Sequence, residues 1–119
     1  MIQISEPLSG SKEESEKHDI LLNGKRIGYV NVSYIQAEEV KSLRKYTKRK
    51  TLAIGQPYSV QVSIDVVGGP INAENLGKDG LRDIIAKLKE NFKGLEERDI
   101  YITELNARGR TIVGRGSQL

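Results

Sequence analysis

The sequence predicts an α+β fold: a small mixed β-sheet with two helices, in the order β-ββ-α-β-α-ββ. Several short segments alternate apolar and polar residues, which is the period of a strand with one buried face. Two longer segments repeat apolar residues every three or four positions, which is the period of an amphipathic helix. With 119 residues and 37% hydrophobic content, the chain is expected to form one domain spanning 1–119.

The first half is expected to contain a short strand, a hairpin and a basic helix. Ile2 and Ile4 alternate with polar residues, and residues 12–19, which include no apolar residue, predict a mobile loop. Asn23-Gly24 separates the apolar segments 20–22 and 27–34, and this pair supplies the positive φ angles of a two-residue hairpin turn. Residues 36–54 then change to a helical period.

The second half is expected to contain a strand, a helix and a terminal hairpin. Residues 58–66 alternate as a half-buried strand, with Asp65 off the apolar face. A helix starting near 76–79 and closed by Gly94 carries an apolar stripe: Leu81, Ile84, Ile85, Leu88 and Phe92. Strands at 100–102 and 111–113 predict the hairpin, and 116–119 a frayed tail.

Composition excludes several classes of function. The absence of Cys and the single His rule out disulfide scaffolds, zinc fingers and Cys-His chemistry, and His18 is expected to be a surface residue. Neither a membrane span nor a secretory signal is evident, so a cytoplasmic protein without a membrane partner is expected. Gly77-Lys78-Asp79-Gly80 lacks the spacing of a phosphate-binding loop, and no nucleotide cofactor is expected.

The charges are sorted along the chain, with a net charge of +3. Acidic residues gather at 13–19 and 96–99, whereas basic ones gather on the first helix and near the C-terminus. Such sorting favours a polyanionic partner, although a solvated helix face is the alternative. The candidate DNA-binding residues are Lys41, Arg44, Lys45, Lys48, Arg49, Lys50, Arg108 and Arg110.

Two segments with acidic residues lie in expected loops. The first follows the strand at 58–66, and the second precedes the strand at 100–102. Asn72-Ala73-Glu74-Asn75-Leu76-Gly77-Lys78 opens the second helix, and Glu96-Glu97 precedes the next strand. Carboxylates from two loops could hold Mg²⁺, which activates water for phosphodiester hydrolysis, while a lysine steadies the phosphate. Simple capping of the helix by Asn75 and Glu74 is the alternative.

In order, these segments resemble the RusA family of Holliday-junction resolvases, small basic dimeric endonucleases of phages and prophages. That family has Asp-x-Asp-Asn-Leu-x-Lys entering a helix and an Asp-Asp pair before the next strand. The strand ending in Pro7-Leu8-Ser9, the segment Gly24-Lys25-Arg26, the basic helix, Pro57 before the long strand and the terminal hairpin extend the resemblance over most of the chain.

The resemblance implies a RusA-like fold, a homodimer and magnesium-dependent cleavage of four-way DNA junctions. Catalytic roles would fall to Glu74, Lys78, Glu96 and Glu97, and Asp65 would join the metal ligands. Asn72 stands at the place of the family's first aspartate, and an amide lacks the charge that attracts Mg²⁺. This difference favours the second hypothesis, a non-catalytic nucleic-acid-binding or phage interaction protein on the same fold. A small acyltransferase-like enzyme is the third.

Overall fold

The computed structural model describes residues 2–11, 14–35, 55–65 and 73–119, which form a mixed α+β fold. The predicted fold class is therefore confirmed. The strands are β1 (Ile2–Ile4), β2 (Ser9–Gly10), β3 (Ser15–Leu22), β4 (Lys25–Tyr34), β5 (Pro57–Asp65), β6 (Ile100–Asn106) and β7 (Gly109–Arg115). Helix α2 covers Ala73–Asn91, and two short 3₁₀ turns are η2 (Glu97–Asp99) and η3 (Gly116–Gln118).

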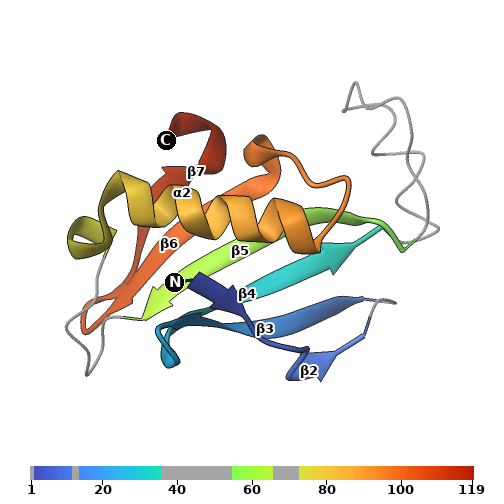
Figure 1. The fold of residues 1–119 in the computed structure, drawn as a ribbon, viewed down its shortest axis with the longest axis horizontal. Coiled ribbons are helices and arrows are strands. Elements are labelled where there is room, and N and C mark those ends of the chain that lie inside the picture. The colour runs from blue at the N-terminus through green and yellow to red at the C-terminus, as the bar shows by residue number, and fades with distance from the viewer. Residues whose placement is uncertain (1, 12–13, 36–54, 66–72) are drawn as a thin grey trace.

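All described strands join one sheet in the order β1-β3-β4-β5-β6-β7, with β2 paired to β3. Neighbours run antiparallel except for β5 and β6, which are parallel, with Val60 opposite Ile100. A connection between parallel neighbours must return along the sheet, and α2 does so across one face (Figure 1). The opposite face, called here the open face, is covered by no described helix.

The hydrophobic core lies between α2 and the covered face of the sheet. Leu81, Ile84, Ile85 and Leu88 of the predicted stripe are buried there. They meet Val and Ile side chains from the central strands: Val30, Val32, Val60, Val62, Ile64, Ile100 and Ile102. Burying each such side chain contributes about 1.5–3 kcal/mol. Within the described residues, no helix is long and apolar enough to cross a membrane.

Two predicted hairpins are confirmed. Asn23 (φ 52°) and Gly24 (φ 83°) form the turn between β3 and β4, as the Asn-Gly pair indicated. β6 and β7 form the terminal hairpin, with Asn106 opposite Gly109. The second helix is interrupted at Gly77 (φ 70°, ψ 175°), which is non-helical: a short turn from Ala73 precedes it, and the main helix starts at Lys78, within the predicted range 76–79. The first predicted helix, 36–54, lies outside the described residues.

Two predictions for irregular segments were wrong. β3 begins at Ser15, so most of the expected loop 12–19 is a strand, and residues 12–13 lie outside the described part. Its inward positions hold Glu16 and His18, which are polar but buried, so hydropathy did not reveal the strand. Residues 116–119 are not frayed, because Gly116 is buried in η3 and Leu119 packs against the core.

A buried polar pair joins β3 to β4. The Tyr34 hydroxyl donates a 2.6 Å hydrogen bond to Glu16 Oε1, and both residues are buried. Burial raises the pKa of Tyr34, and the hydrogen bond and negative charge of Glu16 raise it further. The phenol therefore stays protonated in the folded chain at pH values where an unfolded tyrosine ionises.

Alkaline pH should therefore test this pair. The unfolded chain loses the tyrosine proton near pH 10 and the folded chain only at higher pH, so this stabilisation is complete below pH 10 and is lost above it. We expect the free energy of unfolding to fall by at most about 1.4 kcal/mol per pH unit above pH 10 from this group. Urea denaturation between pH 8 and 11.5 measures it.

Tyr34→Phe should remove this part of the pH dependence, and Tyr101→Phe should retain it. An equal decline in Tyr34→Phe and the wild type would contradict a raised pKa at Tyr34.

Candidate nucleic-acid interface

The two predicted acidic segments lie at opposite ends of α2. Asp65 ends β5 on the side where α2 begins, and Lys78 is exposed in the first turn after Gly77. Glu96 and Glu97 follow the other end of the helix, just before β6. The helix from Lys78 to Asn91 spans roughly 20 Å at 1.5 Å per residue. One chain therefore does not bring Glu96 and Glu97 to the start of α2.

Glu96 and Glu97 have partners at their own end of the fold. The Glu97 carboxylate accepts from Lys89 Nζ at 3.4 Å, and Glu96 pairs with Arg98. The Glu96 backbone N–H donates to Asp99 Oδ2 at 2.9 Å, which closes the η2 turn. These contacts give the acidic segment a structural role in the turn before β6.

The described residues do not contain a fitting metal site. No three His, Asp or Glu side chains among them are placed to hold one metal ion. Asn72 lies outside the described residues, and of Glu74 only the backbone is described, within α2. The magnesium site therefore remains a prediction.

Asp65, the remaining candidate ligand, belongs to an ion-pair cluster. Arg26 donates to Asp19 Oδ1 at 2.9 Å and to Asp65 Oδ2 at 3.2 Å. The hydrogen bond to Asp19 is the main cause that raises the pKa of Arg26, against the lowering effect of burial. One guanidinium thus bridges two carboxylates at the edge of the open face and offsets one of their two negative charges.

The basic candidates separate into two groups. The six on the expected first helix, Lys41 to Lys50, lie outside the described residues. Arg108 is exposed in the β6–β7 turn, where its backbone N–H donates to Asn106 Oδ1 at 2.9 Å. Arg110 lies on β7 and donates to the Tyr29 hydroxyl at 3.2 Å. Of the predicted DNA-binding residues, Arg110 therefore contacts the open face.

The open face carries a continuous row of polar, aromatic and basic residues across five strands. The strand register places Lys17 opposite Asn31, Asn31 opposite Gln61, Gln61 opposite Tyr101 and Tyr101 opposite Arg115. Each belongs to the set that alternates with buried core residues, so the row faces away from α2. A basic residue stands at each end of the row.

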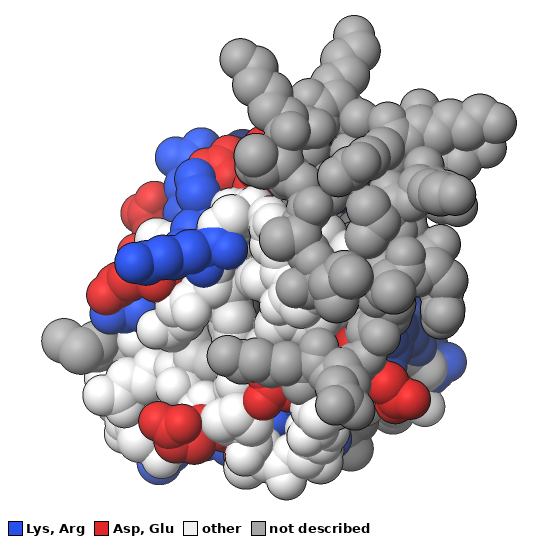
Figure 2. Space-filling model, turned by 90° about the vertical axis from the view of Figure 1, so that its right-hand side faces the viewer, with Lys and Arg blue, Asp and Glu red and all other residues white. Residues whose placement is uncertain are grey.

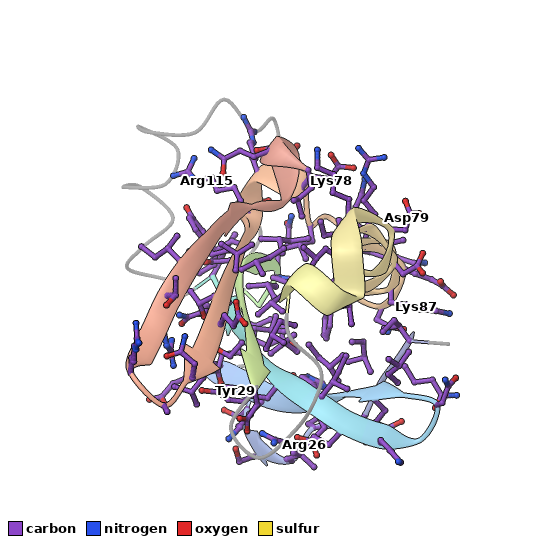
Figure 3. All side chains as sticks on the ribbon, turned by 90° about the vertical axis from the view of Figure 1, so that its left-hand side faces the viewer. Arg26, Tyr29, Lys78, Asp79, Lys87 and Arg115 are labelled. Carbon is purple, nitrogen blue, oxygen red and sulfur yellow. The ribbon has the colours of Figure 1, made fainter. Side chains whose placement is uncertain are left out.

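Cations lie against both tyrosines of this face. Lys17 Nζ is 4.3 Å from the ring centroid of Tyr29, and Arg26 Cζ is 5.7 Å from it. Arg115 Cζ is 5.0 Å from the ring centroid of Tyr101. Figure 3 shows Arg26 and Tyr29 on the sheet, apart from Lys78, Asp79 and Lys87, which surround the helix. These cation–π contacts orient the basic side chains over the open face.

A shallow cleft of about 670 Å³ follows the row at its β6–β7 end. Tyr101 and Ile112, 40% and 81% exposed, are large apolar side chains in its lining. Gln61, Arg110 and Arg115 are among the other residues that line it. Exposed apolar surface flanked by polar and basic groups is typical of a binding site.

The helix layer has a different character. Acidic and basic side chains alternate over it (Figure 2). Lys87 pairs with Glu90 at 3.7 Å, and Lys89 with Glu97 at 3.4 Å. This mixture is typical of a solvated surface and does not favour a polyanion.

Comparison of the chain with protein-family models, with curated proteins and with solved structures finds no match. The resemblance to the RusA family therefore stays a prediction, and the geometry of the open face is the basis for assigning a function.

Proposed function

We propose that this protein binds nucleic acid through the open face of its sheet. The row from Lys17 to Arg115 carries the proposal, because it combines cations with an exposed aromatic ring and amide side chains. Basic side chains bind phosphates without reading sequence, and aromatic rings stack on unpaired bases. The second of the three sequence-based hypotheses, a nucleic-acid-binding protein, agrees best with this arrangement.

Single-stranded segments are the proposed substrate class. Five adjacent strands place Lys17 and Arg115 roughly 19 Å apart, at about 4.8 Å per strand. Tyr101, 40% exposed, and Ile112 offer flat apolar area inside this span. A duplex keeps its base faces stacked, whereas an unpaired strand can lay them on the sheet. An unpaired base therefore gains an interaction with Tyr101 that a paired base cannot reach.

Cleavage of four-way junctions remains the prediction from the resemblance. It would add a chemical step to binding, and that step requires Mg²⁺ held by carboxylates. An assay for nicking of an end-labelled four-way junction, run with Mg²⁺ and with EDTA, distinguishes cleavage from binding alone. Magnesium-dependent nicking that Glu74→Gln abolishes would support the resolvase hypothesis; binding without nicking would support binding alone. Light scattering on the same sample tests the proposed homodimer.

Removing the two cations at the ends of the row should lower the salt dependence of binding. On a single strand, each phosphate that the protein no longer neutralises lowers the slope of log affinity against log salt by about 0.7. We expect Lys17→Gln/Arg115→Gln to reduce the slope by about 1.4 and to weaken binding to any sequence. Fluorescence anisotropy with a labelled oligothymidine at several salt concentrations measures this slope.

Lys87→Gln/Lys89→Gln is the matched control, since it removes the same charge from the helix layer. An unchanged slope in the open-face variant, or an equal reduction in the control, would argue against an interface on the open face.

Tyr101→Ala should specifically weaken binding to unpaired strands. Removing the ring on which one base stacks costs about 1–3 kcal/mol, or roughly 5- to 150-fold in Kd. Tyr101→Phe should retain most of the affinity, because it keeps the ring. Competition between a single strand and the same strand in duplex form gives the preference. Equal weakening for both forms would exclude stacking by Tyr101.

A further inference from the structure

A second cleft lies on the α2 side of the sheet, away from the proposed nucleic-acid interface. It has a volume of about 460 Å³ and is lined by residues at the end of α2. Figure 1 shows this end of the helix toward the right. Glu16, His18 and Tyr34 line it from β3 and β4, and Phe92 lines it from the chain following α2. Three of these residues are polar and more than nine-tenths buried. Burying polar side chains lowers the stability of the fold unless their donors and acceptors form hydrogen bonds.

Glu16 is the first unusual group in this cleft. Its side chain is 7% exposed, and the Tyr34 hydroxyl is its single hydrogen-bond partner among the described residues. None of the described Lys or Arg side chains forms an ion pair with it. A buried carboxylate that lacks a cation is rare, because burial removes the water that stabilises the charge.

His18 is the second unusual group. Its Nδ1 lies 2.8 Å from the Ser5 carbonyl oxygen, and because a carbonyl only accepts, Nδ1 carries the proton. In the neutral ring Nε2 is then an acceptor, and this atom is buried with no partner in the described part of the chain. The Phe92 ring packs against the imidazole at 5.2 Å between centroids. Among the described residues, His18 Nε2 therefore lacks a hydrogen-bond donor, and Glu16, which accepts from the Tyr34 hydroxyl, lacks a cation.

An organic cation meets these needs better than a metal ion. The described residues offer no trio of His, Asp or Glu around one point, as a metal site requires. An ammonium group needs only acceptors and a negative charge, and aromatic rings attract it further. The cleft supplies the Glu16 carboxylate, the Tyr34 oxygen and the rings of Tyr34 and Phe92, and the exposed Glu90 and Lys93 also line it with opposite charges. Its volume suits a small molecule.

We infer that this cleft binds a primary alkylammonium group. The ammonium donates to the Glu16 carboxylate, the alkyl chain lies along Phe92, and His18 Nε2 is the second acceptor in the cleft wall. The group can come from a free amine or from a lysine side chain of a bound peptide. This inference is independent of nucleic-acid binding, because the residues of the open face play no part in it.

NMR titration of the full-length protein tests the inference. His18 is the only histidine, so the imidazole ¹⁵N and ¹H signals arise from the cleft alone. We expect n-butylammonium chloride, added at constant ionic strength, to shift these signals saturably. n-Butanol, similar in size and uncharged, should bind at least about tenfold more weakly, since it cannot form a charge-assisted hydrogen bond. A capped lysine-containing pentapeptide forms the second arm and distinguishes a free amine from a peptide ligand.

Glu16→Gln is the key variant, because it keeps the side-chain shape and an acceptor for Tyr34 while removing the charge. It should weaken butylammonium binding at least about tenfold. Asp83→Asn removes an exposed carboxylate of α2 that does not line this cleft, and it should bind as the wild type does.

Three outcomes would overturn the inference: no saturable shift with either ammonium probe, equal affinity for butanol, or full binding by Glu16→Gln. The comparison of butylammonium with butanol uses the wild type, so the test holds even if Glu16→Gln fails to fold.

Discussion

The parallel pairing of β5 with β6 is the constraint on which the other features depend. Parallel neighbours need a connection that returns along the sheet, and α2 provides it by packing its apolar stripe on one face. One helix layer buries one face only, so the alternate positions of each strand are left for polar and aromatic residues. The same crossover places the start of α2 beyond one end of β5 and Glu96-Glu97 beyond the other. The open face and the separation of the acidic segments thus have one cause.

Short sequence patterns correctly predicted the elements that are determined by residues close together in the chain. The stripe of α2 and the Asn23-Gly24 turn are both set by residues within a few positions of one another. The order of the strands, and therefore the row from Lys17 to Arg115, depends on pairings between distant segments that periodicity does not encode. The polar alternation of residues 59, 61 and 63 was visible in the sequence, and it could have indicated an open face. The distance between the acidic segments was also implied, because the predicted helix lies between them.

The first part of β3, residues 15–19, was missed because its inward positions are occupied by polar residues. Glu16 and His18 occupy sites where Val or Ile would have revealed the strand, and their partners come from elsewhere: Tyr34 on β4 and Ser5 after β1. No window of sequence around 12–19 contains those partners. A buried polar side chain is tolerated only where the fold supplies its hydrogen bond, so such positions are the least predictable from hydropathy. In this chain they also line the second cleft, which explains why sequence patterns did not indicate it.

The pairing state of the cations explains why the open face suits a polyanion better than the helix layer does. Lys87, Lys89 and Arg98 each pair with a glutamate, and an approaching phosphate would be repelled by that carboxylate. Lys17 and Arg115 instead lie against neutral rings. A cation over a ring can keep that interaction and still donate to a phosphate, so no ion pair has to break. Arg26 pairs with Asp19 and Asp65 and so offsets one of their two negative charges, which reduces their repulsion of a phosphate.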